Sequence, residues 1–260
     1  MTTFNSSPWL AGSVSSVLAQ SWRNFELVVV DDGSVDETPE LLRRWAEADM
    51  RVRACLLDRN IGTYPAKNIG MSISHGDVVT FMDSDDFIDA SRLQKQLDRL
   101  RQPGLVATTC NYVRKTIDGV IVPNGGLMER QALVSLMFKR QVLLEVGWFD
   151  RVRTSADDEF FERIRHIYGR GAHSNVSEPL YHALYRNDSL TTQGAAPMLM
   201  EATNDEGMLS PPRRAYVEAY RSWYLAASRH RKRPYIPFEM GDERPFPIPL
   251  PLELSGNRAS

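Results

Sequence analysis

Two clusters of acidic residues, each placed directly after an apolar run, are the residues best suited to chemistry in this chain. The apolar run 27–30 leads into Asp31-Asp32-Gly33-Ser34, and the apolar run 78–82 leads into Asp83-Ser84-Asp85-Asp86. In an open α/β sheet, ligands bind beyond the carboxyl ends of the strands, so acidic groups at those ends face a bound molecule. Two carboxylates spaced as Asp-x-Asp can share a hard divalent cation, which most often serves a phosphate or diphosphate.

Each cluster also has a structural interpretation. The residues around Asp83 and Asp85 could form a solvated turn that caps the next helix. Asp36 and Thr38, which follow the first cluster, are typical of an Asx turn and a helix cap. The position of each cluster after a buried strand favours function for Asp83 and Asp85, and for Asp32, which could accept a hydrogen bond from a base imide or a ribose hydroxyl. We assign a structural role to Asp36.

The elements that must hold these clusters alternate between strands and helices over the first hundred residues. Helices are expected where apolar residues recur at helical spacing, and strands where short apolar runs lie between turn signals. This alternation predicts an α/β fold with a mostly parallel sheet of right-handed βαβ units, flanked by helices. Two predicted helices begin at residues 7 and 38, two more span 65–74 and 89–100, and the predicted strands are 26–30, 52–57 and 77–82.

The pattern becomes less regular after residue 103. Strands are expected at 105–113 and 119–122, and helices at 157–168 and 216–227, the last followed by a basic run and a proline-rich tail. We predict one main domain over residues 1–195, followed by a carboxy-terminal extension over 196–260. The main domain comprises a nucleotide-binding half (1–102) and an acceptor half (103–195) that covers the crevice. The tail should form an extended strap or a mobile end.

Composition narrows the class of protein. The 260 residues carry a net charge of −2, which gives no reason to expect nucleic acid as a partner, and the two cysteines support neither a disulfide framework nor a thiolate zinc site. There is no run of about 18 apolar residues and no signal-peptide pattern, so we expect a cytoplasmic protein. The basic segment 213–233 could favour an anionic membrane surface, although a solvated helix face is the favoured interpretation.

Five motifs, in this order, resemble those of the family 2 glycosyltransferases, which have the GT-A fold. The resemblance is close over about residues 1–100, and the ordered set is far more specific than any single motif. The motifs are Thr2-Thr3-Phe4-Asn5, Val30-Asp31-Asp32-Gly33-Ser34-x-Asp36-x-Thr38, Asn60-x-Gly62, Ala66-Lys67-Asn68-x-Gly70 and Phe81-Met82-Asp83-Ser84-Asp85-Asp86.

The resemblance implies roles for residues on the donor side. Thr2, Phe4 and Asp32 would line the nucleoside pocket of a nucleotide-sugar. Asp83 and Asp85 would form the Asp-x-Asp pair that contacts the ribose, the diphosphate and a Mg²⁺ or Mn²⁺ ion. Lys67 stands where the family usually has arginine, and it keeps the positive charge but lacks the planar fork that makes bidentate contacts.

A later segment, Ser155-Ala156-Asp157-Asp158-Glu159-Phe160, resembles the family segment that supplies the catalytic base. The alignment favours Asp157 as the base, with Asp158 as the second choice. Favourable negative charge at a helix start explains Asp158 and Glu159 without a catalytic role. Arg186 lies in a segment similar to one near the diphosphate in the family, but a single loop arginine is usually a surface charge.

Members of this family normally have a buried strand before the segment that corresponds to Thr2-Thr3-Phe4-Asn5. This chain begins almost at that strand's end. Because an interior strand supplies two ladders of hydrogen bonds, we expect that the true start lies upstream or that the chain is a fragment, with activity affected if the strand is truly absent.

The sequence therefore predicts an inverting, metal-dependent glycosyltransferase that moves a sugar from a nucleotide-sugar, expected to be a UDP-sugar, to a hydroxyl of a glycan or lipid-linked acceptor. Two alternatives stay open. One is a non-catalytic subunit that binds nucleotide-sugars. The other is a nucleotidyltransferase, which would ordinarily carry a glycine-rich basic loop near its amino end; residues 5–24 show no such loop.

Overall fold

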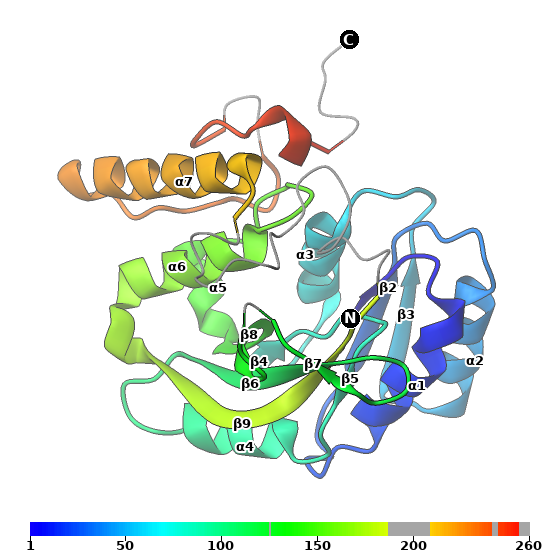
Figure 1. The fold of residues 1–260 in the computed structure, drawn as a ribbon. Helices are drawn as coiled ribbons and strands as arrows, with labels where there is room; N and C mark the ends of the chain where they lie inside the picture. The colour runs from blue at the N-terminus through cyan, green and yellow to red at the C-terminus, as the bar shows by residue number, and fades with distance from the viewer. Residues whose placement is uncertain (125, 187–208, 241–243, 255–260) are drawn as a thin grey trace.

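The first third of the chain forms a parallel sheet between two layers of helices. A computed structural model describes residues 1–124, 126–186, 209–240 and 244–254. Strand order in this sheet is β1-β2-β3, and all pairs are parallel, as predicted. Its elements are β1 (Thr2–Thr3), α1 (Ser7–Leu18), β2 (Leu27–Asp31), α2 (Thr38–Ala48), β3 (Val52–Leu56) and α3 (Thr63–Ile73) (Figure 1).

Strand β2 is buried on both faces, and its alternating side chains contact different helices. Leu27 and Val29 pack in one apolar cluster with α1 and α2, whereas Val28 and Val30 pack with Ala66 of α3. The period of two in a strand explains this division. Because helices cover both faces, the sheet leaves its carboxyl-terminal edge, where Asp31 and Asp32 lie, as the place for a ligand.

A second, mixed sheet follows, with the strand order β4-β8-β6-β9-β5. The pair β6–β9 is parallel, while β4–β8, β8–β6 and β9–β5 are antiparallel. The α/β fold class is confirmed, and the parallel pairing that the sequence predicts is concentrated in the first sheet. The strands are β4 (Val78–Thr80), β5 (Phe87–Ile88), β6 (Ala107–Lys115), β7 (Ile121–Val122, paired with β6), β8 (Arg130–Lys139) and β9 (His173–Leu184).

Helices cover the second sheet and join it to the carboxy-terminal region. The main apolar cluster combines Phe138 of β8 and Phe160 of α6 with Tyr216 and Tyr220 of α7. Figure 1 shows α7 lying across the α5–α6 side of the molecule. The helices are α4 (Arg92–Leu100), α5 (Leu143–Val146), α6 (Ala156–Tyr168) and α7 (Pro211–Arg229), with short 3₁₀ turns at Arg140–Val142, Arg170–Ala172 and Leu250–Leu252.

The described parts of the proline-rich tail pack against the body of the protein as an extended strap. Ile236 accepts a hydrogen bond from the Trp148 amide at 2.8 Å and pairs with Gly147. Phe246 and Leu252 are buried in the same cluster as α7. In the described residues, no helix combines the length and the apolar character needed to cross a membrane. The division at residue 195 remains a prediction, because residues 187–208 lie outside the described residues.

Candidate active site

The loop of the second acidic cluster is fixed so that two carboxylates project from it. The buried Asp86 carboxylate accepts hydrogen bonds from the Tyr181 hydroxyl (2.6 Å) and from the Leu184 amide (2.9 Å). From α1, the Ser13 hydroxyl donates to the carbonyls of Ser84 (2.8 Å) and Asp86 (2.7 Å). Asp86 and Ser84 therefore hold the turn, and this leaves the side chains of Asp83 and Asp85 as its partly exposed acids.

Each of those two acids pairs with a cation. Asp83, with 42% of its side chain exposed, accepts a hydrogen bond from the Lys67 amine at 3.0 Å. Asp85, 21% exposed, pairs with Arg186 at 2.6 Å. Burial and then the negative charge of Asp83 raise the pKa of Asp85, whereas Arg186 opposes this rise. The two carboxylates are therefore close enough to interact, as an Asp-x-Asp pair on one turn requires.

This pair fits a small hard cation. Mg²⁺ and Mn²⁺ prefer oxygen ligands, and Mg²⁺ is commonly held by one or two carboxylates together with substrate phosphates. Asp83 and Asp85 supply such carboxylates, and the cationic side chains of Lys67 and Arg186 lie beside them. Among the described residues, no three acidic, histidine or cysteine side chains gather so that they could hold a metal ion by themselves. The pair would thus bind a cation together with a diphosphate.

The first acidic cluster shapes the loop in front of α3. Asp32, 3% exposed, accepts hydrogen bonds from the amides of Ile61 (2.7 Å) and Gly62 (2.9 Å). Burial raises its pKa, and these two hydrogen bonds oppose the rise. Asp36 instead accepts hydrogen bonds from the amides of Ser7 (3.1 Å) and Thr38 (3.0 Å). It holds two helix starts, which confirms the structural role predicted for it.

The amino-terminal residues assigned to the nucleoside pocket lie beside both clusters. Thr2 pairs with Val30 of β2 and also forms a parallel bridge with Asp83, and its hydroxyl lies 2.9 Å from the Thr63 hydroxyl. Phe4 follows at the edge of the sheet, with 47% of its surface exposed. The structure therefore brings Thr2 to Asp83 and leaves an aromatic ring accessible close by.

Helix α3 connects the donor-side acids to the predicted base. Tyr64, in its first turn, donates a hydrogen bond from its hydroxyl to Asp157 Oδ1 at 2.7 Å. Lys67 lies one turn further along, with its amine 5.5 Å from the centre of the Tyr64 ring. The Asp83–Lys67 ion pair, the contact of Lys67 with the Tyr64 ring and the Tyr64–Asp157 hydrogen bond thus connect Asp83 and Asp157, 74 positions apart in the sequence, through the first turns of α3.

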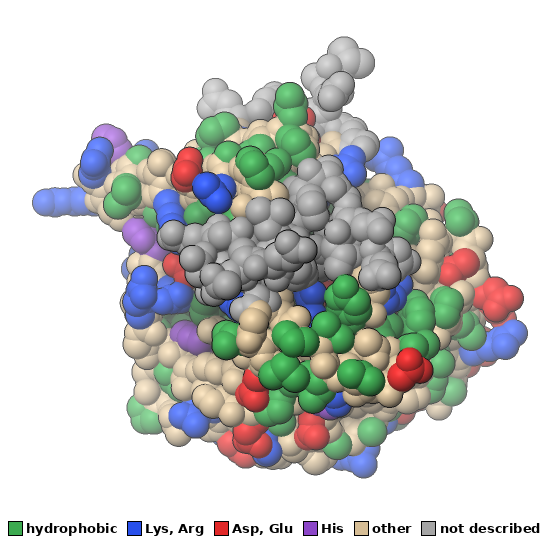
Figure 2. All heavy atoms as spheres, viewed as in Figure 1, with side chains coloured by type: hydrophobic (Ala, Val, Ile, Leu, Met, Phe, Trp, Pro, Cys, Tyr) green, Lys and Arg blue, Asp and Glu red, His purple; other side chains and the backbone are tan. Residues whose placement is uncertain are grey.

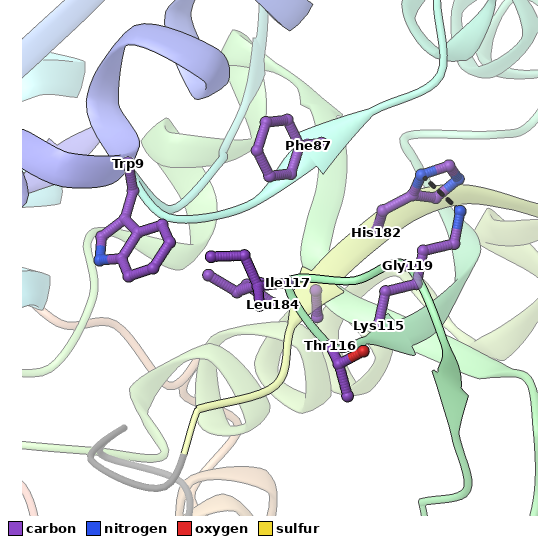
Figure 3. Close-up of a pocket in the computed structure, with 9 residues that line it drawn as sticks. Trp9, Phe87, Lys115, Thr116, Ile117, Gly119, His182 and Leu184 are labelled. Carbon is purple, nitrogen blue, oxygen red and sulfur yellow. Dashed lines mark hydrogen bonds between the residues drawn. The ribbon is translucent and has the colours of Figure 1, made fainter.

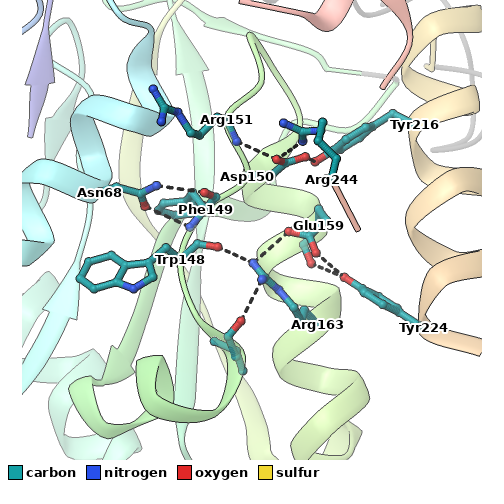
Figure 4. Close-up of polar contacts among 11 residues, drawn as sticks. Asn68, Trp148, Phe149, Asp150, Arg151, Glu159, Arg163, Tyr216, Tyr224 and Arg244 are labelled. Atoms are coloured by element: carbon teal, nitrogen blue, oxygen red, sulfur yellow. Dashed lines mark hydrogen bonds and ion pairs between the residues drawn. The ribbon is translucent and has the colours of Figure 1, made fainter. Parts of the chain in front are cut away.

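The acids next to Asp157 point elsewhere. Asp158 accepts a hydrogen bond from the Tyr220 hydroxyl at 2.7 Å, and burial raises its pKa to about 6 against that hydrogen bond. Glu159 is fully buried, with Arg163 at 3.0 Å and the Tyr224 hydroxyl at 2.8 Å. Figure 4 shows Glu159 between Arg163 and Tyr224. Both acids have structural partners, so Asp157 is the half-buried acid of this turn that faces α3.

Several residues of the site were not singled out from the sequence. Tyr64 and Tyr181 hold the side chains of Asp157 and Asp86, and Arg213 donates a hydrogen bond to Ser155, just before α6 (2.7 Å). The spacing of Tyr64 and Lys67, three residues apart, is the signal that could have found Tyr64, because such residues share a helix face. No local pattern identifies Tyr181, because its partner lies 95 residues away.

A pocket of about 220 Å³ opens beside the Asp83–Asp86 loop. Figure 3 shows Trp9, Phe87 and Leu184 around it, with Lys115 contacting His182 at 3.3 Å on one wall. The Arg186 guanidinium lies 5.7 Å above the Trp9 ring, so this pocket adjoins the ion pair of Asp85. Figure 2 shows hydrophobic side chains gathered on this face.

Comparison with solved structures supports the GT-A fold. Residues 1–349 of S. aureus TarS in complex with UDP-GlcNAc superpose with a TM-score of 0.59 at 21% identity, covering 72% of this chain and 58% of that chain. The mannosyltransferase PcManGT of Pyrobaculum calidifontis, in complex with GDP-Man and Mn²⁺, gives a TM-score of 0.53 at 18% identity, covering 89% of this chain and 63% of that chain.

Comparison with sequences is more specific. An uncharacterized glycosyltransferase of Haemophilus influenzae is 39% identical over 119 residues, 46% of this chain and 48% of that protein. A putative teichuronic acid biosynthesis glycosyltransferase, TuaG of Bacillus subtilis, is 31% identical over 117 residues, 45% of this chain and 46% of that protein. The chain spans about half the length of these relatives. The family model described as glycosyl transferase family 2 matches residues 1–161, more than half of the chain, and the protein therefore belongs to glycosyl transferase family 2.

Proposed function

We propose that this protein transfers a sugar from a nucleotide-sugar to an acceptor hydroxyl, with inversion at the anomeric carbon. The observation that carries the proposal is the chain Asp83–Lys67–Tyr64–Asp157. It joins an acid of the Asp-x-Asp pair to a carboxylate in the first turn of α6. Inverting transfer needs both parts: charged groups that bind the leaving diphosphate, and a base on the acceptor side.

In this mechanism Asp157 takes the proton of the acceptor hydroxyl. The acceptor oxygen attacks the anomeric carbon as the bond to the diphosphate oxygen breaks, and the nucleoside diphosphate leaves with the bonding electron pair. Tyr64 holds one oxygen of Asp157 by its hydrogen bond of 2.7 Å, so the other oxygen is available for the proton. Placing the base in advance reduces the entropic cost of the step.

On the donor side, Thr2, Phe4 and Asp32 would contact the nucleoside, and Asp83 and Asp85 the ribose and diphosphate. A bound Mg²⁺ or Mn²⁺ would neutralise charge that develops on the leaving diphosphate. Lys67 and Arg186 now pair with the two acids. When the acids hold a cation, the Lys67 and Arg186 side chains would turn to phosphate oxygens.

We propose UDP as the nucleotide and a glycan or lipid-linked molecule as the acceptor. The TarS complexes with UDP and UDP-GlcNAc, which share the fold, support UDP. The names of two relatives, TuaG and the succinoglycan biosynthesis protein ExoO, support polysaccharide synthesis. The largely apolar pocket at Trp9 and Phe87 favours a lipid-linked acceptor, because it could hold an apolar group close to Asp85.

The test is nucleotide release from a panel of UDP-sugars and GDP-mannose, with Mn²⁺ or with EDTA. The proposal predicts slow release without acceptor, faster release with acceptor, and loss of both in EDTA. Asp85→Asn should abolish the metal-dependent release, whereas Asp98→Asn, on the exposed side of α4, should retain it. Metal-dependent UDP binding without any turnover would identify a non-catalytic subunit instead, and pyrophosphate release from nucleoside triphosphates would identify a nucleotidyltransferase.

A further inference from the structure

Helix α7 presents a row of tyrosines to the loop and helix that carry the proposed base. Tyr216, Tyr220 and Tyr224 recur every four residues and therefore share one helix face. Each hydroxyl donates to a different acid: Tyr216 to Asp150 (2.9 Å), Tyr220 to Asp158 (2.7 Å) and Tyr224 to Glu159 (2.8 Å). Figure 4 shows Tyr216 and Tyr224 reaching these acids from α7. A buried tyrosine hydroxyl needs a hydrogen-bond partner, and here each partner is an acid of the loop or helix that carries the proposed base.

Arg213, in the first turn of α7, contacts Ser155, the residue directly before α6. Its guanidinium donates to the Ser155 hydroxyl at 2.7 Å, and only 7% of Arg213 is exposed. Ser155 has a φ of 72°, a left-handed conformation that costs a non-glycine residue about 1–2 kcal/mol. Such a conformation persists only where the surroundings determine it, and it is frequent at active sites. Arg213 therefore helps to fix the direction in which α6 starts.

We propose that α7 is part of the catalytic apparatus, with Arg213 and Tyr220 as positioning residues for Asp157. Arg213 fixes the turn before α6, and Tyr220 draws Asp158 towards α7, so that Asp157 faces Tyr64 and the donor site. This inference rests on the proposed function, in which Asp157 is the base. The family match covers residues 1–161, and α7 lies outside it.

The charges around Asp157 give the proposal a measurable consequence. The groups that face it are the Tyr64 hydroxyl from α3, the Arg213 guanidinium from α7 and the Asp158 carboxyl from its own helix. Burial lowers the pKa of Arg213, while the charges of Tyr64, Asp157 and Asp158 favour its charged form. Removal of the Arg213 side chain changes the set of groups that hold Asp157 in place, so its effect should appear in kcat and not in the donor KM.

The experiment compares four variants of the full chain: Arg213→Met, Arg213→Lys, Tyr220→Phe and the matched control Tyr216→Phe. Tyr216→Phe removes a hydroxyl from the same helix face as Tyr220→Phe does. The acid that loses its hydrogen bond is Asp150, which lies seven residues before Asp157. We expect Arg213→Met to lower kcat about tenfold or more, with the donor KM nearly unchanged. Arg213→Lys should restore part of the lost kcat, Tyr220→Phe should lower kcat, and Tyr216→Phe should keep wild-type kcat per folded molecule.

Equal kcat in Arg213→Met and Tyr216→Phe would overturn the inference. If the wild-type protein shows no turnover, the proposed function fails first, and amide hydrogen exchange then decides the positioning role. Exchange at residues 159–162, whose amides donate the first hydrogen bonds of α6, should be about tenfold faster in Arg213→Met and Tyr220→Phe than in Tyr216→Phe, because local opening of the helix start breaks those bonds. Equal exchange in all three variants would show that α7 does not position this turn.

Discussion

Asp157 and Asp158 are neighbours in the sequence, but their surroundings give them different chemistry. The hydroxyl of Tyr64 holds Asp157 towards the donor-side acids, whereas the hydroxyl of Tyr220 holds Asp158 towards α7. The sequence could predict that an acid of this segment matters, because a helix start with three acids resembles a known motif. It could not choose between them on physical grounds, because the partners that separate them lie 93 and 62 residues away.

The pH dependence of stability should report on Asp158. Because its folded-state pKa is raised to about 6, above the unfolded value near 4, its contribution to stability is fully present below pH 4 and is lost as the pH rises through 6. Asp158→Asn cannot titrate. Its free energy of unfolding, relative to wild type, should therefore increase by about 1–2 kcal/mol between pH 4 and pH 7. Urea unfolding at both pH values measures this, and parallel stability curves for the two proteins would contradict it.

At the scale of elements, the sequence predicts what is locally periodic. Helices α1 and α2 begin at the predicted residues, and α3 and α6 lie within two residues of their predicted limits, because caps, prolines and apolar spacing all lie within each segment. Strands β8 and β9 were not predicted. In β9, only three of the twelve residues are buried, and Pro179 interrupts the run, so its apolar pattern is weak. Such strands depend on pairing with β6, which a local pattern does not show.

Helix α3 is the element that links the two halves of the site, and Tyr64→Phe tests that link. The variant keeps the ring, which packs 5.5 Å from Phe149, but loses the hydrogen bond to Asp157. We expect kcat to fall about tenfold with little change in donor KM, because only the base is released. Steady-state kinetics measures both constants. The control is Tyr112→Phe in β6, which loses a hydroxyl contact to Asn124; equal kcat in the two variants would contradict the link.

At the scale of the whole molecule, the carboxy-terminal region shares its core with the rest of the protein. Tyr216, Tyr220, Phe246 and Leu252 are buried in the same cluster as Phe138 and Phe160. The sequence predicts packing of α7, because Tyr216, Tyr220, Trp223, Tyr224 and Ala227 recur at helical spacing, and this packing is confirmed. It did not predict where the tail attaches, because the prolines that space Phe246 and Leu252 remove any periodic signal.

The attachment of the tail at Gly147 gives a stability prediction. Gly147 has a φ of 78°, and a Cβ there would lie 2.0 Å from the Ile236 carbonyl oxygen. Gly169 has a φ of 83°, but a Cβ there would meet nothing within 4 Å. Gly169→Ala should therefore cost about 1–3 kcal/mol, because its φ of 83° with a ψ of 155° is a conformation open almost only to glycine, and Gly147→Ala about 1–3 kcal/mol more from the clash. Urea unfolding of both variants measures the difference, and equal losses would show that the tail does not dock at Gly147.

The most direct test of the account is sugar transfer by Asp157→Asn. The experiment compares Asp157→Asn with the wild type and with the control Glu162→Gln, using one donor and one acceptor. Glu162→Gln changes another carboxylate of α6. The account predicts that Asp157→Asn loses about 100-fold or more in kcat while donor KM stays nearly unchanged, and that Glu162→Gln transfers at the wild-type rate. Wild-type transfer by Asp157→Asn, or a larger loss in Asp158→Asn, would contradict the assignment of the base.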